Sequence, residues 1–364
     1  MRIPDHLEGD AVGKVALLDL TYSELEDLVL SLGQPRYRAA QVAQWLYKHL
    51  ASDFKEMHNL PLALRDLLAE VSEIGRLTPL EETTSQDGLT RKVLFSLPDG
   101  HTIESVLMHY QRRHTVCLST QVGCPIGCPF CATGQSGFER DLSSGEIVEQ
   151  VLYFARQLQG KGQRPTNLVF MGMGEPFLNW EATWKAIQAL TDPRRFGLGA
   201  RHITISTAGF VPGIEALTRE NSQVGLAISL HAANDELRER LVPLNRRYPL
   251  EVLMKACQDY VKRTGRRITF EYALIERLND SLSHAQELAG LLSGLLCHVN
   301  LIPLNATAEC VWRGSPKGVV LAFQRELLKE EVPVTIRIDR GLDIEAGCGQ
   351  LRSRRGVDFS PHKV

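Results

Sequence analysis

Three cysteines that lie close together are the residues best suited to chemistry. Cys124, Cys128 and Cys131 form a C-x3-C-x2-C pattern. Cysteine thiolates hold iron–sulfur clusters, and three protein ligands on a four-iron cluster leave one iron open to an exogenous ligand. The alternative is structural zinc, which needs a fourth protein ligand and usually shows a second nearby ligand pair. No such pair follows in the sequence, so a zinc ion would need a fourth ligand from a distant part of the chain.

Composition and length narrow the class of protein. The chain has 364 residues, 43% of them hydrophobic and 23% charged, with a net charge of −2, which is ordinary for a globular protein. No apolar run reaches the roughly 18 residues of a membrane helix, and the acidic, proline-containing first ten residues are unlike a secretory signal. We therefore expect a cytoplasmic protein with no membrane segment. In that reducing compartment eight cysteines are metal ligands or catalysts rather than disulfides.

Strands and helices alternate from residue 115 onward. Strands are expected at 115–120, 167–171, 202–206, 224–230, 268–274, 298–304 and 334–338. Helices are expected at 144–158, 180–190, 212–219, 250–264, 282–296 and 318–330. This alternation predicts right-handed βαβ units and a parallel sheet. Six units predict an α/β fold that is a partial (β/α)6 barrel, with its chemistry at the carboxyl ends of the strands.

The residues before the barrel predict a small α+β accessory domain. Thr21 and Glu24 have the spacing of a helix capping box. Helices over about the first eighty residues are followed by three short strands, which two Asp-Gly turn signals separate. The expected division is an accessory domain over 1–110, a barrel over 111–345 and a C-terminal tail over 346–364.

The cysteine motif and its context resemble a known family. C-x3-C-x2-C after the first strand of a partial barrel is similar to the radical S-adenosylmethionine (SAM) superfamily. Five further segments resemble the RlmN family, radical SAM methyltransferases that act on C2 of adenine in rRNA and tRNA. They are residues 117–124, 171–176, 205–207, 229–232 and 343–351. The resemblance runs from about residue 16 to 351, so it implies both the barrel fold and the activity.

The resemblance also implies where the cofactors bind. The three cysteines would hold one [4Fe–4S] cluster per chain, and residues that end separate strands would hold SAM. Those SAM contacts are Gly174, Glu175, Ser206, Ser229, Leu230, His231 and Asn305. From the residues alone, a glutamate in a glycine-rich turn either accepts hydrogen bonds from the amino group of methionine or is simply solvated. A single histidine is more often structural than catalytic.

Two further cysteines receive roles from the resemblance. Cys348 lies between two glycines, and Cys117 lies on the strand that leads into the cluster loop. Taken singly, each is more typical of a buried thiol. The resemblance implies that Cys348 is an S-methylated carrier and that Cys117 resolves the intermediate through a transient disulfide. By contrast, Cys257 shares a helix stripe with apolar residues and is expected in the core.

The implied mechanism explains why a carrier is needed. C2 of adenine is electrophilic and cannot attack a sulfonium methyl group. Two SAM molecules are used per turnover: one methylates Cys348, and the second gives a radical that takes hydrogen from this methyl group. The methylene radical adds to C2, a base removes the C2 proton, and Cys117 displaces the product. Glu104 resembles the proton acceptor, although the alternating pattern around it equally fits a plain polar strand position.

Partners also follow from the resemblance. The implied substrates are 23S rRNA and tRNA, the implied electron donor is a flavodoxin or ferredoxin, and a monomer is expected. We expect the accessory domain to grip RNA, because aromatic side chains beside basic ones can stack on bases. The residues concerned are Arg36, Arg38, Trp45, Tyr47 and Lys48.

Three competing hypotheses remain. A Cfr-like enzyme would methylate C8 with the same cysteines, although Pro176 and the segment 302–305 favour C2. A zinc-bound RNA-binding module would need no pocket at the strand ends. A radical enzyme that activates a protein glycyl site would not need the cysteine pair. Three features depart from the RlmN pattern: Ala306 replaces a usual proline, Gly347 replaces a usual alanine, and the segment 275–280 lacks a glycine often found before its Asn-Asp pair.

Overall fold

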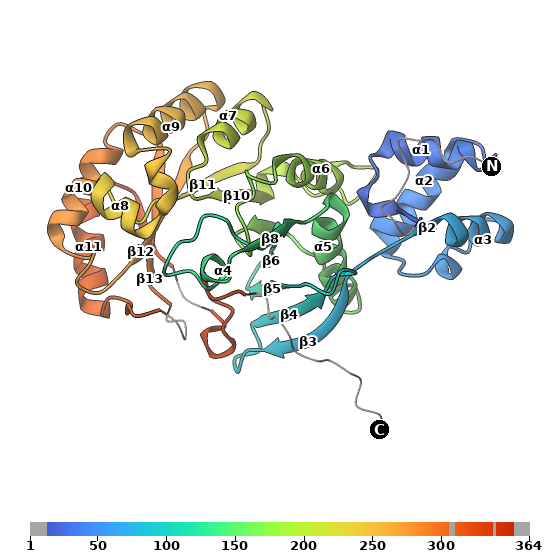
Figure 1. Cartoon of the computed structure of the whole chain (residues 1–364), viewed down its shortest axis with the longest axis horizontal. Helices are drawn as coiled ribbons and strands as arrows, with labels where there is room; N and C mark the ends of the chain where they lie inside the picture. The colour runs from blue at the N-terminus through green and yellow to red at the C-terminus, as the bar shows by residue number, and fades with distance from the viewer. Residues whose placement is uncertain (1–12, 306–309, 338–339, 353–364) are drawn as a thin grey trace.

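A ten-stranded sheet forms the centre of the molecule in the computed structural model, which describes residues 13–305, 310–337 and 340–352. Seven neighbouring strands pair in parallel. In order across the sheet they are β6 (Arg113–Cys117), β9 (Asn167–Phe170), β10 (Ile203–Thr207), β11 (Gly225–Ser229), β12 (Ile268–Leu274), β13 (Cys297–Pro303) and β14 (Val334–Ile336). The predicted partial (β/α)6 barrel is therefore confirmed (Figure 1).

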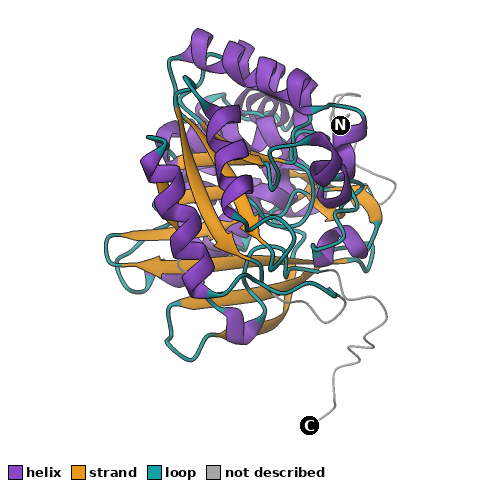
Figure 2. Cartoon of the chain, turned by 90° about the vertical axis from the view of Figure 1, so that its left-hand side faces the viewer, coloured by secondary structure: helices purple, strands orange, loops and turns teal. Residues whose placement is uncertain are grey.

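Helices cover the outer face of these strands (Figure 2). They are α5 (Ser144–Gln159), α6 (Trp180–Thr191), α7 (Val211–Arg219), α8 (Asp235–Leu241), α9 (Leu250–Thr264), α10 (Leu282–Leu292) and α11 (Lys317–Lys329). A capping box of Ser143 and Glu146 begins α5. The short helix α8 was not predicted, and it places Arg238 beneath the site described below.

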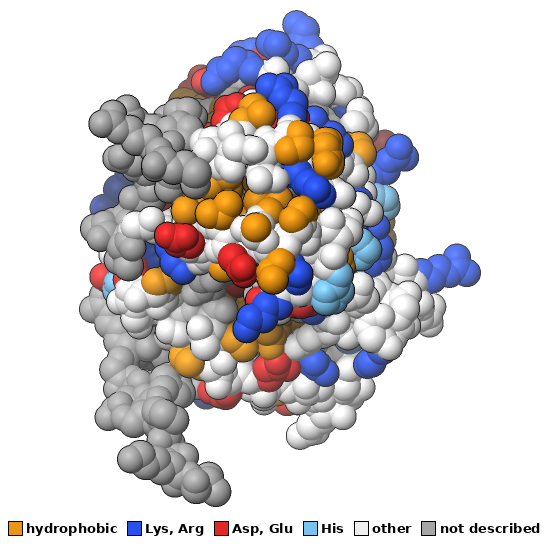
Figure 3. Space-filling view, turned by 90° about the vertical axis from the view of Figure 1, so that its right-hand side faces the viewer, with side chains coloured by type: hydrophobic (Ala, Val, Ile, Leu, Met, Phe, Trp, Pro, Cys, Tyr) orange, Lys and Arg blue, Asp and Glu red, His pale blue; other side chains and the backbone are white. Residues whose placement is uncertain are grey.

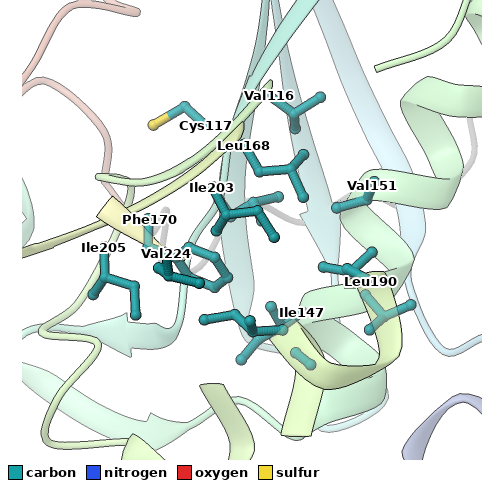
Figure 4. Close-up of a cluster of buried hydrophobic side chains, with 14 of the residues drawn as sticks. Val116, Cys117, Ile147, Val151, Leu168, Phe170, Leu190, Ile203, Ile205 and Val224 are labelled. Carbon is teal, nitrogen blue, oxygen red and sulfur yellow. The ribbon is translucent and has the colours of Figure 1, made fainter. Parts of the chain in front are cut away.

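The main core lies between the parallel strands and these helices. Val116, Leu168 and Ile203 project from three strands toward α5 and α6 (Figure 4). Successive side chains of a strand point to opposite faces, so Cys117, next to Val116, points its sulfur away from this cluster (Figure 4). Cys257 is fully buried in the same core, as predicted.

A helical subdomain precedes the sheet. It contains α1 (Tyr22–Ser31), α2 (Tyr37–Gln44), a π-helical turn (Trp45–His49) and α3 (Leu62–Val71). Strands β1 (Val15–Ala16) and β2 (Ser72–Glu73) pair beside these helices, and the predicted capping box at Thr21 begins α1. The subdomain is anchored to the barrel by Asp19, whose carboxylate accepts the N–H of Gly145 at 2.6 Å.

The three strands after this subdomain belong to the barrel sheet. They are β3 (Thr78–Thr84), β4 (Thr90–Ser96) and β5 (Thr102–Tyr110), and β5 pairs antiparallel with β6. Tyr110 faces Arg113 across a tight turn, so residue 110 lies within a continuous sheet. The expected accessory domain over 1–110 includes these strands, because a hairpin turn in the sequence shows that two strands pair but not which larger sheet they join.

A small ribbon frames the cysteine loop. β7 (Gln121–Gly123) pairs antiparallel with β8 (Phe138–Asp141), and α4 (Ala132–Gln135) lies between them. Gly123 has φ +75°, and a Cβ there would meet the carbonyl oxygen of Gly137 at 1.9 Å. The ribbon therefore requires glycine where the cluster loop begins. Among the described residues, no helix is long and apolar enough to cross a membrane.

Candidate active site at the strand ends

A cavity opens at the carboxyl ends of the parallel strands. Its space unoccupied by atoms is about 1050 Å³, including the open mouth. The predicted residues that line it are Cys124, Cys128, Cys131, Gly174, Glu175, Ser206, Ser229, His231, Asn305 and Cys348. Leu230 lies behind the wall, fully buried, and its N–H binds the carbonyl oxygen of Glu271 at 3.0 Å. Residues far apart in the chain thus converge because parallel strands end at one edge.

The three loop cysteines share the wall nearest α4. Burial raises the pKa of the Cys124 thiol to about 12 and that of Cys128 well above its usual range, and the neighbouring thiols act in the same direction. Metal binding must therefore deprotonate them. Among the described residues, no three His, Cys, Asp or Glu side chains converge on one ion. A four-iron cluster would fit the three cysteines that line this cavity, since each thiolate would bind a different iron.

Glu175 is buried at the end of the turn after β9. Its carboxylate accepts the N–H groups of Ala208, at 2.7 Å, and Phe177, at 3.1 Å. Burial nevertheless dominates and raises the pKa of Glu175 to about 7. The carboxyl group is therefore poised to ionise when a cation such as the SAM ammonium approaches.

This pKa leads to a testable pH dependence. Only the ionised carboxylate pairs with an ammonium group, and the ionised fraction falls as the pH drops through about 7. We expect SAM to bind holoenzyme more weakly at about pH 6 than at about pH 8. Glu175→Gln should lower affinity roughly tenfold or more and remove this pH dependence, because one charge-assisted hydrogen bond contributes about 1.5–3 kcal/mol.

Glu149 provides the matched control. Its pKa is also raised to about 7 by burial, but it accepts the N–H groups of Arg76 and Leu77 and does not line the cavity. Calorimetric titration of Glu149→Gln with SAM should give wild-type affinity and pH dependence. Equal losses in both variants would contradict a specific contact between Glu175 and SAM.

The glycines of the turn after β9 are required by close packing. A Cβ on Gly172 would lie 2.6 Å from the carbonyl oxygen of Leu118, and one on Gly174 would lie 2.6 Å from the Gln121 side chain. Gly174 also has φ +101°. Close packing against the loop after β6 therefore requires these glycines.

His231 is held as a neutral hydrogen-bond donor. Its Nδ1 accepts the backbone N–H of Ala273 at 3.0 Å, which places the ring proton on Nε2. Burial, together with the Arg238 charge, lowers the pKa of His231 to about 3, so the ring stays neutral at physiological pH. Its φ of 63° is rare for a residue with a side chain and is typical of functional sites.

The Cys348 loop is tied to both halves of the cavity. The carbonyl oxygen of Gly349 accepts the N–H of Ala132 in α4 at 2.8 Å, and that of Cys348 accepts the Asn305 amide at 3.3 Å. A Cβ on Gly347 would lie 2.6 Å from Asn305 Nδ2. The glycine at this position therefore suits the placement of Asn305, while Ala306 lies outside the described residues.

Cys117 and Cys348 meet in a second, smaller cavity beside the first. Both line it, and Cys348 lines the large cavity as well. Burial and the neighbouring Cys348 raise the pKa of Cys117 to about 12, while Arg337 acts in the opposite direction. A thiol here is protonated in the resting state. A group that takes its proton is needed before it can act as a nucleophile.

Arg337 and Glu271, which were not among the predicted site residues, also line the large cavity. Their side chains lie 3.9 Å apart. Glu271 Oε2 is buried and has no hydrogen-bond partner among the described residues, so it can accept a hydrogen bond from a ligand. Each residue lies in or just after a strand at the cavity edge, which is the signal that could have identified them.

Glu104 is buried and lies outside the cavities in which a substrate could bind. It is 1% exposed, pairs with Lys92 at 3.2 Å and accepts the N–H of Arg352 at 3.1 Å. It lines neither described cavity. Any proton transfer to Glu104 would therefore need a rearrangement or an intervening group.

Comparison with known proteins identifies the class. Residues 118–289 match the radical SAM superfamily, and residues 15–74 match the ribosomal RNA large subunit methyltransferase N-terminal domain. A radical SAM methyltransferase from Sphaerobacter thermophilus has 52% identity and a TM-score of 0.91, over 93% of this chain and 99% of that one. Fold and site together define a radical SAM methyltransferase, a class that uses SAM and a [4Fe–4S] cluster.

Two relatives show to which family of methyltransferases the chain belongs. The probable dual-specificity RNA methyltransferase RlmN of Geobacillus kaustophilus is 45% identical over 93% of each chain. The ribosomal RNA large subunit methyltransferase N of Nitrosopumilus maritimus is 48% identical over 93% of this chain and 98% of that protein. This chain belongs to the RlmN family.

Proposed function

We propose that this enzyme makes 2-methyladenosine in 23S rRNA and in tRNA, with Cys348 as methyl carrier and Cys117 as resolving cysteine. The observation that carries the proposal is that Cys348 lines both the large cavity and the small one that contains Cys117. The names of the relatives, which include dual-specificity RNA methyltransferases, support the RNA substrates. They support RlmN chemistry rather than the Cfr-like alternative.

Each proposed role belongs to a named part of the cavity. Cys124, Cys128 and Cys131 hold one cluster per chain, and the strand-end residues hold SAM, of which two molecules are used per turnover. When bound, these cofactors supply a methyl group and a hydrogen-abstracting radical. Glu175 pairs with the ammonium group, and His231 donates from Nε2. Cys348 carries the methyl group to adenine, and Cys117 releases the product by forming a disulfide.

Mass spectrometry of nucleosides tests this proposal. Holoenzyme, SAM, a reductant and unmodified 23S rRNA or tRNA should give 2-methyladenosine in both RNAs. 8-Methyladenosine would instead support Cfr-like chemistry, and no methylated adenosine in either RNA would contradict the proposal. Product in only one of the two RNAs would contradict the proposed dual specificity but would still support the proposed chemistry.

We further propose that the enzyme works as a cytoplasmic monomer and receives electrons from a flavodoxin or ferredoxin. The cytoplasm contains the RNA substrates and such carriers. Size-exclusion chromatography with light scattering tests the monomer, and reduction of the cluster by purified flavodoxin or ferredoxin tests the donor.

The helical subdomain is proposed to grip RNA, but through different aromatic residues from those expected. Tyr47 is buried, and the Arg195 guanidinium stacks over its ring. Trp45 is half-buried, and its indole N–H donates a hydrogen bond to Asn59 Oδ1. Tyr37, which sequence analysis overlooked, is 57% exposed beside Arg38. Lys and Arg side chains on this end of the molecule are dispersed among neutral and acidic ones (Figure 3).

Substitution of two exposed neighbours in this subdomain, Arg36 and Tyr37, provides a test. Because one base stack contributes about 1–3 kcal/mol, Tyr37→Ala with Arg36→Glu should lower RNA methylation roughly tenfold or more at limiting RNA. SAM cleavage without RNA should be unchanged. Lys262→Glu, an exposed charge change on α9, is the control and should leave both activities intact. A double variant that methylates normally would exclude this surface from RNA binding.

A further inference from the structure

The Arg238 guanidinium is a buried cation that no carboxylate binds directly. The side chain is fully buried on α8, and none of the ion pairs among the described residues includes it. Burying a charge is costly unless it is paired and hydrogen-bonded. The site must therefore supply both the hydrogen bonds and the compensating negative charge.

The hydrogen bonds come from backbone that forms the proposed SAM pocket. Nη2 donates to the carbonyl oxygen of Ala208 at 2.7 Å and to that of Ser229 at 3.4 Å, and Nε donates to Leu230 at 3.2 Å. Nη1 donates to Asn245 Oδ1 at 2.8 Å. The guanidinium thus joins the ends of β10 and β11. The Ala208 N–H in turn donates to Glu175, so one network fixes the pocket backbone and its carboxylate.

The negative charge lies on the side of the cluster loop. Cys128 packs against an apolar cluster that includes Leu237 and Leu241, which flank Arg238 on α8. Cys128 is the first of the groups whose charge raises the pKa of Arg238, ahead of Asp235, although burial outweighs them. Asp235 is at the surface, where its carboxylate accepts the Asn245 amide and the Leu250 N–H. The Cys128 thiolate, with the metal centre that it would bind, would therefore supply the counter-charge for Arg238.

We propose that Arg238 is a positioning residue with two separable effects: its charge stabilises the reduced cluster, and its hydrogen bonds hold the SAM-binding strand ends. This inference rests on the proposed cluster at Cys124, Cys128 and Cys131. Reduction adds one electron, from an external donor, to a centre that three thiolates already make anionic. In a water-poor environment a nearby fixed cation favours that added charge.

Two variants separate these effects. Arg238→Gln removes the charge, so the cluster midpoint potential should shift to more negative values, as measured by anaerobic potentiometric titration of the reduced-cluster EPR signal. Arg238→Lys keeps a charge but cannot bridge four acceptors. It should keep a potential close to that of wild type while binding SAM roughly tenfold more weakly.

Arg195→Gln is the matched control. Arg195 is also buried and donates to the Leu20 carbonyl oxygen at 2.8 Å, but it lies beside the helical subdomain and outside the large cavity. The Arg195→Gln substitution should leave both the cluster midpoint potential and the affinity for SAM unchanged.

The outcomes distinguish this inference from the proposed function. An unchanged potential in Arg238→Gln, or an equal shift in Arg195→Gln, overturns the electrostatic effect. If Arg238→Gln does not fold, a marked negative shift in Arg238→Lys overturns it equally. Normal SAM affinity in Arg238→Lys overturns the positioning effect. A wild-type protein that holds no iron–sulfur cluster contradicts the proposed function itself.

Discussion

The Cys117→Ala protein is expected to stall with RNA covalently attached. Once the carrier methylene is bonded to adenine, a second thiol must attack Cys348 sulfur to release the product, and Cys117 shares the small cavity with Cys348. Alanine removes this thiol without altering the residues that line the large cavity. Turnover should fall by several orders of magnitude, and a slow-migrating, ribonuclease-sensitive band should accumulate on denaturing gels.

The matched variants determine which cysteine bears the RNA. Cys348→Ala, alone or combined with Cys117→Ala, should give no such band. Cys297→Ala removes a buried cysteine that lines neither cavity and should turn over normally. Normal turnover by Cys117→Ala, or an adduct in the Cys348→Ala background, is incompatible with the two-cysteine mechanism.

Alanine at any one of Cys124, Cys128 or Cys131 is expected to abolish the cluster and all SAM cleavage. Three thiols hold three irons in the proposed site, so no ligand is redundant. Iron analysis and the visible absorption of anaerobically reconstituted protein should show the loss of cluster. The yield of 5′-deoxyadenosine should fall to background, a loss of several orders of magnitude.

Cys310 is the informative control for this result. It packs against the same apolar cluster as Cys128 and Cys131 but does not line the large cavity. Cys310→Ala should retain wild-type iron content and SAM cleavage. Loss of iron in this variant, or full activity in any one of the three ligand variants, would require a different set of ligands.

Local signals in the sequence were sufficient to predict the strands and helices of the barrel. The strand over 268–274 and the helix over 250–264 have the predicted bounds, and the predicted capping box at Thr21 forms. Such features depend on neighbouring residues and on hydrophobic periodicity. The sequence did not predict that the antiparallel strands β3–β5 join the barrel sheet, because their pairing with β6 is a tertiary contact that turn residues do not encode.

In the functional site, too, some features follow from local sequence and others depend on packing between distant elements. The order of strand-end motifs predicted that Glu175, Ser206 and Ser229 lie together, because the ends of parallel strands converge. The burial of Tyr47 and the contacts of Arg238 could not be foreseen. An aromatic residue beside basic ones suits either surface or core, and a lone arginine in a charged segment resembles any solvated residue. Only packing between distant elements separates these possibilities.

The central claim is that Cys348 carries the methyl group, and mass spectrometry of the protein tests it most directly. Methyl transfer to a thiolate is a simple displacement that needs no electron. Holoenzyme incubated with SAM labelled in its methyl carbon, without reductant, should therefore carry one labelled methyl group on the peptide that contains Cys348. Addition of RNA, unlabelled SAM and reductant should then move the labelled carbon to adenine. Labelled RNA that forms while Cys348 is never labelled, or label on another cysteine instead, would contradict the account.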